Sequence, residues 1–157
     1  MNTVLYLSTR GPVYETRAYT KADITHLIEN HQLHCLTSAD RQFDFWFSPS
    51  TAACQRRANV RATELLLATT SFNAKSVPLL PGSVVVATHD ADGDLDGLSW
   101  EQLDRLVRRN RSLTDRELRV LDRRIARHDR RLARHSPSAA ATPAPRVKPR
   151  VAVAAKG

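Results

Sequence analysis

The chain is poor in cysteine and glycine, and it has no long apolar run. Its two cysteines, Cys35 and Cys54, stand in no repeated Cys-x-x-Cys spacing, so the sequence predicts neither a disulfide framework nor a zinc knuckle. It contains no glycine-rich phosphate loop and no Gly-x-Ser-x-Gly or His-Glu-x-x-His motif. No apolar run approaches the roughly 20 residues that span a bilayer, and the start of the chain lacks the basic segment of a secretory signal. We therefore predict a cytoplasmic protein that is not an enzyme, uses no cofactor or metal and has no membrane partner.

Charge is unevenly distributed along the 157 residues. Residues 1–98 carry eight Lys or Arg and ten Asp or Glu, a net charge of −2, whereas residues 99–157 carry sixteen and six, a net charge of +10. Lys and Arg that neutralise phosphates release condensed counterions, so a basic segment of this kind favours nucleic acid as the partner. We expect the C-terminal third to bind nucleic acid and the rest of the chain to supply the fold.

Strand and helix patterns alternate through the first 98 residues. Strand patterns cover residues 3–7, 13–19, 33–36, 43–47 and 84–87, the first four as two hairpins and the last as a central strand buried on both faces. One helical pattern follows the capping box of Thr20 and Asp23, and a second covers residues 59–70. Phe43, Phe45 and Phe47 share one strand face and are expected to pack under the helices rather than stack on bases. We predict an α+β core domain over residues 1–98, with a small mixed sheet of about five strands and two packed helices.

The C-terminal third has a different pattern. Capping boxes at Ser99 and Thr114 predict two helices joined by a short turn, a basic αα-hairpin over residues 99–135. In the second helix, apolar residues follow heptad spacing and arginines occupy the other faces; the apolar positions are Leu118, Leu121, Ile125 and Leu132. Residues 136–157 are dominated by Ala, Pro, Val, Lys and Arg and include no acidic or aromatic residue, which predicts a disordered tail.

The expected nucleic-acid contacts are Lys and Arg residues of the helical hairpin and of the tail. They are Arg108, Arg109, Arg116, Arg119, Arg123, Arg124, Arg127, Arg130, Arg131, Arg134, Arg146, Lys148 and Arg150. An alternative is a solvated helix face on which arginines pair with nearby acids, as Asp115 and Arg119 could at i,i+4 spacing. Around Arg146 and Lys148, the tail is similar to a minor-groove hook, but Val147 replaces its central glycine, so diffuse phosphate contact is the preferred interpretation.

A second hypothesis is a protein-interaction module. In that case the heptad residues pair with a second copy or with a host protein, and the arginines face an acidic partner surface. The wide arginine face repels a second copy and His128 interrupts the heptad pattern, so we expect a monomer. Trp46 lies on the strand face opposite the phenylalanines and is a further candidate for a partner surface.

Two groups of potential metal ligands are weaker candidates. The acidic loop from Asp90 to Gly97 invites a calcium interpretation, but no loop register satisfies both the glycine and the final carboxylate, so we favour a solvated turn. His31, His34, Cys35 and Cys54 could form a zinc site with His26, yet their spacing matches no established set. We predict no metal site.

Two short motifs carry a family resemblance. Asn59-x-x-Ala62-Thr63-x-Leu65-Leu66 and Pro81-Gly82-Ser-Val-Val-Val86, within the strand and helix order above, resemble the uncharacterised small-domain family catalogued as domain of unknown function 3846. The resemblance covers about residues 3–98. It implies a phage or prophage origin and a compact α+β core, and it implies no activity. Together these observations predict a non-enzymatic, phage-type accessory protein that binds nucleic acid.

Overall fold

The computed structural model describes residues 2–49 and 56–134 and shows an antiparallel sheet with four helices. The strands are β1 (Thr3–Leu7), β2 (Val13–Arg17), β3 (His34–Thr37), β4 (Asp44–Phe47), β5 (Val84–His89) and β6 (Leu95–Asp96); the helices are α1 (Lys21–Ile28), α2 (Val60–Thr69), α3 (Trp100–Arg111) and α4 (Asp115–Arg134). The predicted α+β class is confirmed. The tail over residues 136–157 lies outside the described residues. None of the helices in the described ranges is both long and apolar enough to cross a membrane.

The sheet order is β2-β1-β5-β4-β3, and the short β6 pairs with β5 beyond this path. The two predicted hairpins are β1–β2 and β3–β4, and β5 lies between them as the predicted central strand. Every strand pair is antiparallel, so the expectation of a mixed sheet is wrong. The reason is that β5 enters the gap between the hairpins antiparallel to both of its neighbours.

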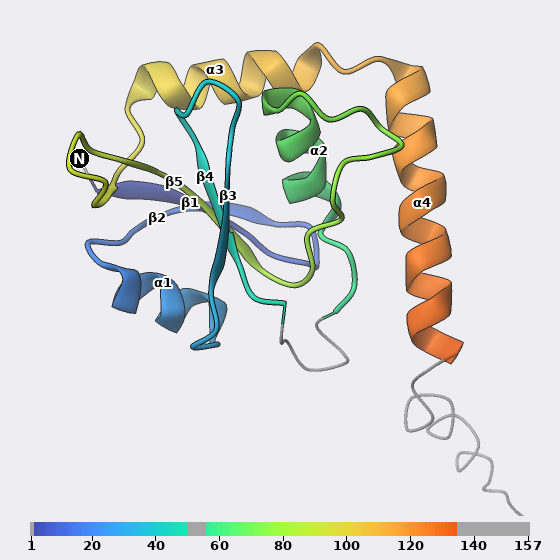
Figure 1. Cartoon of the computed structure of the whole chain (residues 1–157), viewed down its shortest axis with the longest axis horizontal. Coiled ribbons are helices and arrows are strands. Elements are labelled where there is room, and N and C mark those ends of the chain that lie inside the picture. The colour runs from blue at the N-terminus through green and yellow to red at the C-terminus, as the bar shows by residue number, and fades with distance from the viewer. Residues whose placement is uncertain (1, 50–55, 135–157) are drawn as a thin grey trace, which may run out of the picture.

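Helices cover both faces of the sheet (Figure 1). On one face, α1 packs against Val4, Val85 and Ala87. On the other face, α2 and the C-terminal helices cover Phe43 and Phe45. The first four residues of the central strand, 84–87, are all apolar and buried, so each face of the sheet needs a helix to exclude water from it.

Both C-terminal helices belong to this core. Leu106 of α3 and Leu121 and Ile125 of α4 lie in the same buried cluster as Phe43 and Phe45. The core is therefore not complete at residue 98, where the sequence analysis expected it to end. The two helices also do not fold back on each other as an αα-hairpin, because both pack against α2 and α4 turns away from α3 (Figure 1).

Asn59 fixes the start of α2 to the sheet. Its Oδ1 accepts a hydrogen bond from the Ala62 amide at 3.1 Å, and its Nδ2 donates to the carbonyls of Leu7 at 2.8 Å and Gly82 at 2.9 Å. The Thr63 hydroxyl, one turn into the helix, accepts from the Leu80 amide at 3.1 Å. These buried bonds place α2 on the sheet, and α2 in turn supports α4.

Candidate functional site

Six arginines lie on one side of α4 and form the Arg stripe. They are Arg116, Arg119, Arg123, Arg127, Arg130 and Arg134, and all six are exposed. Successive members are three or four residues apart, so at about 100° per residue they occupy a sector of about 80°. With a rise of 1.5 Å per residue, the stripe is about 27 Å long. The basic helix face that the sequence predicts is therefore present on α4 as one continuous surface.

The opposite side of α4 is buried. Leu121 and Ile125 are 0% and 6% exposed, and on the helix they lie about 180° from the middle of the Arg stripe. Packing of these two side chains into the core thus fixes the Arg stripe toward solvent. Leu121 and Ile125 are covered by the chain itself, so these two heptad residues are not free to pair with a second helix.

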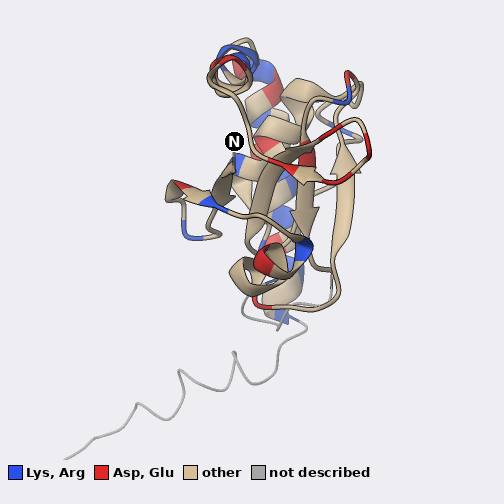
Figure 2. Cartoon of the chain, turned by 90° about the vertical axis from the view of Figure 1, so that its left-hand side faces the viewer, with Lys and Arg blue, Asp and Glu red and all other residues tan. Residues whose placement is uncertain are grey.

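The Arg stripe has no counterion within the described residues. The ion pairs there are Arg57–Asp129, His89–Asp44, Arg108–Asp104 and Arg109–Asp40. None involves the stripe, and the pair between Asp115 and Arg119 that the sequence allowed is not formed. Seen from the side away from α4, bases are scattered and several segments are acidic (Figure 2). The positive charge of the stripe is consequently available to an external anion.

Arg124, which the sequence analysis placed among the nucleic-acid contacts, has a structural role instead. Its Nη1 donates hydrogen bonds to the carbonyl oxygens of Ala74 at 2.9 Å and Val77 at 2.8 Å. Its position on the flank of the helix directs it to the loop that follows α2. The helical spacing already separates Arg124 from the stripe, but the sequence gives no sign of the two carbonyls.

The remaining predicted contacts fall into three groups. Arg131 is exposed on the flank of α4 nearer to Arg124. Arg108 and Arg109 of α3 pair with Asp104 at 2.6 Å and Asp40 at 3.0 Å. Burial acts to raise the pKa of the Asp40 carboxyl, but the Ser38 hydroxyl, the Gln42 amide and the Arg109 charge outweigh it and hold the pKa below its usual value. Arg146, Lys148 and Arg150 lie outside the described residues.

Arg123 and Arg124 are neighbours in sequence, but their replacement is expected to affect stability to very different extents. We expect Arg124→Ala to lower the free energy of unfolding by about 2 kcal/mol, because it removes two charge-assisted hydrogen bonds. We expect Arg123→Ala to change it by less than about 0.5 kcal/mol, as for exposed residues without contacts. Urea denaturation of the two variants measures the difference. Equal effects would contradict the assignment of Arg124 to the fold.

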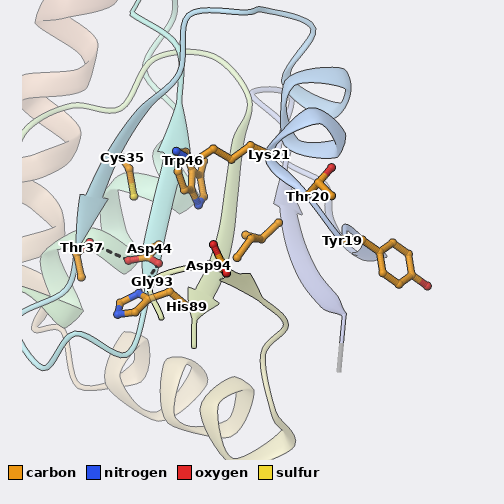
Figure 3. A pocket seen from close by; sticks show the side chains of 11 residues that line it. Tyr19, Thr20, Lys21, Cys35, Thr37, Asp44, Trp46, His89, Gly93 and Asp94 are labelled. Atoms are coloured by element: carbon orange, nitrogen blue, oxygen red, sulfur yellow. Dashed lines mark hydrogen bonds and ion pairs between the residues drawn. The ribbon is translucent and has the colours of Figure 1, made fainter. Parts of the chain in front are cut away.

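A cleft of about 800 Å³ opens on the face of the sheet that α1 covers in part. At its floor, the buried Asp44 carboxylate accepts a hydrogen bond from the Thr37 hydroxyl at 2.7 Å and pairs with Nδ1 of His89 at 2.7 Å (Figure 3). At its rim, the Lys21 ammonium lies 5.3 Å from the centre of the Trp46 ring. Trp46, a candidate partner surface in the sequence analysis, packs against the cluster under α1 instead.

The cleft contains an oriented histidine but no activated nucleophile among the described residues. A histidine held by a carboxylate has the arrangement of a general base, which takes a proton from water, from a substrate or from a nucleophilic side chain. Cys35 is the candidate by residue type, yet desolvation in the cleft, followed by the negative charge of Asp44, raises the pKa of its thiol to about 11. The thiol is therefore protonated at neutral pH and weakly nucleophilic. The pair of Asp44 and His89 joins β4 to β5.

The acidic loop forms the tight turn between β5 and β6. Oδ1 of Asp90 accepts hydrogen bonds from the amides of Asp92 at 2.9 Å and Asp94 at 3.0 Å. In residues 2–49 and 56–134, no three His, Cys, Asp or Glu residues come together as a metal site would require. Cys54, one of the ligands considered for zinc, lies outside these ranges.

No protein-family model, curated protein or solved structure matches this chain. The resemblance to domain of unknown function 3846 stays a prediction from the sequence. The functional interpretation accordingly depends on the geometry of α4.

Proposed function

We propose that this protein is a non-enzymatic accessory protein that binds nucleic acid through the Arg stripe of α4. The observation that carries the proposal is the set of six exposed arginines without counterions in the described chain, opposite the buried face of the same helix. Guanidinium groups bind phosphates in charge-assisted, bidentate hydrogen bonds. A phage-type setting for this role comes from the family resemblance alone.

The stripe fits phosphate contact better than base reading. Its length of about 27 Å corresponds to about eight steps of 3.4 Å along one strand. Beside the arginines, α4 presents the exposed Ala126 and Ala133, and the helix contains no Asn or Gln that could read base edges. We therefore propose sequence-independent binding, to which the Lys and Arg residues of the tail add further positive charge.

The salt dependence of binding tests the proposal. With about six phosphate contacts, the slope of log affinity against log salt is expected to be about −5, so affinity falls about a thousandfold between about 50 and 200 mM NaCl. Fluorescence anisotropy of a labelled duplex of mixed sequence measures this slope. A duplex of peptide nucleic acid with the same bases and no phosphates is the control and is expected not to bind. Binding that is absent at low salt, or that is equal for the two duplexes, would contradict the proposal.

A further inference from the structure

The outer edge of β2 has an identifiable pattern of backbone groups. β2 is the first strand in the sheet order and pairs with β1 on one side only. The Ser8 amide donates to the Pro12 carbonyl at 3.0 Å, and the Ala18 amide donates to the Asn2 carbonyl at 3.0 Å. Hydrogen-bonded pairs alternate along an antiparallel ladder, so even-numbered residues of β2 face β1. The N–H and C=O groups of Val13, Glu15 and Arg17 consequently face outward.

The charges on this edge are self-complementary. When two copies of one strand pair antiparallel about a two-fold axis, the residue on the axis faces its own equivalent. An axis at Thr16 places Glu15 opposite Arg17 of the second copy, and Arg17 opposite Glu15, with the outward backbone groups of both residues paired. A two-fold axis at Glu15 would place the Glu15 carboxylates of the two copies opposite each other, and like charges in such a pair are destabilising. The register centred on Thr16 is therefore the favoured one.

An apolar groove of about 540 Å³ runs between this edge and α3. Trp100, Val107 and Val13 line it and are 73%, 47% and 44% exposed. A strand added beside β2 would extend the floor of the groove and cover these side chains. Exposed apolar groups that gather in this way are typical of interaction surfaces. The groove is lined from β1, β2, α2 and α3, so the Arg stripes of two paired copies are not part of the contact.

We propose that the partner at this edge is a second copy of the chain, paired antiparallel through β2 about a two-fold axis at Thr16. The expectation of a monomer was drawn from α4 alone, whose heptad residues Leu121 and Ile125 are buried in the core. The cross-strand pairs of Glu15 and Arg17 set the register, and the exposed apolar side chains beside β2 provide the area that dimerisation removes from water.

Charge reversal tests this register. The full chain, freed of nucleic acid by nuclease, is expected to rise from 17.6 kDa toward twice that mass along a concentration series in multi-angle light scattering. Glu15→Arg and Arg17→Glu each create two like-charge pairs, so each variant is expected to dimerise about tenfold more weakly. A mixture of the two variants, and the double variant Glu15→Arg/Arg17→Glu, restore opposite charges at both positions and are expected to dimerise like the unchanged chain.

The controls separate this proposal from misfolding and from nucleic-acid binding. Far-UV circular dichroism of each variant is expected to match that of the unchanged chain, because both residues lie on an edge strand. Loss of three stripe arginines is expected to leave dimerisation unchanged. An unchanged chain that stays monomeric at every concentration would overturn the proposal. A dimer that the single variants do not weaken, or a mixture that stays monomeric, would overturn the register and assign the groove to another occupant.

Discussion

The triple variant Arg119→Gln, Arg123→Gln and Arg127→Gln is expected to bind a nucleic-acid duplex about a hundredfold more weakly than the unchanged chain at moderate salt. These residues occupy successive turns in the middle of the Arg stripe and are exposed. Each phosphate contact that is lost reduces the salt slope by about one unit. The variant should therefore show both a lower affinity and a slope that is less negative by about 2 to 3 units.

A variant with the same loss of charge elsewhere is the matched control. Arg10→Gln, Arg41→Gln and Lys75→Gln remove three exposed positive charges outside α4. If position on the stripe matters, this control is expected to keep an affinity within about threefold of the unchanged chain and to keep its salt slope. Equal losses in the two variants would show that net charge alone attracts the nucleic acid, and the assignment to α4 would be wrong.

Local signals in the sequence predicted most of the elements. The capping boxes of Thr20 and Ser99 are both formed, with side-chain and backbone partners three residues apart. Thr114 and Glu117 exchange the same pair of hydrogen bonds before α4. These signals are predictable because each involves neighbouring residues in one helical turn, and the hairpins depend on short turns for the same reason.

Contacts between distant segments were not predictable in this way. The placement of α3 and α4 against α2 depends on which apolar side chains meet across the core. The apolar pattern of each helix is compatible with packing against α2 and with packing of α3 and α4 against each other. Arg124 shows the same limit at the candidate site, because its two carbonyl partners belong to a loop about fifty residues earlier. The Arg stripe itself follows from spacing of three and four residues, whereas its lack of counterions is a property of the fold.

The motifs behind the family resemblance have structural roles. Asn59 and Thr63 anchor α2 through buried hydrogen bonds. Gly82, which accepts one of these bonds, has a φ of 70°, a left-handed conformation that glycine adopts without strain. The motif residues hold the core together. For this reason the resemblance predicted a fold but no functional site.

Removal of residues 99–157 is expected to unfold the chain, although the charge pattern suggested that the first 98 residues form a complete domain. The truncation removes Leu106, Leu121 and Ile125 from the core that also contains Phe43 and Phe45. Loss of one large buried aliphatic side chain costs about 2 to 5 kcal/mol, so three cost about 6 to 15 kcal/mol. The whole stability of a domain is about 5 to 15 kcal/mol, which leaves little or nothing.

Polar contacts act in the same direction. α3 is tied to the β3–β4 turn by the ion pair of Arg109 with Asp40 at 3.0 Å and by a hydrogen bond from Gln102 to the Gln42 carbonyl at 3.3 Å. Without α3 and α4, Phe43 and Phe45 at β4 and Leu66 of α2 would be exposed to water.

A second truncation, after Arg134, provides the comparison. It removes residues 135–157 and retains every described residue of the core, so its melting temperature in far-UV circular dichroism is expected to stay within about 2 °C of that of the full chain. The truncation after Leu98 is expected to show no cooperative melting transition. A sharp transition in the shorter fragment would mean that β1 to β6, α1 and α2 fold without the C-terminal helices, and that α3 and α4 are an attached element rather than part of the core.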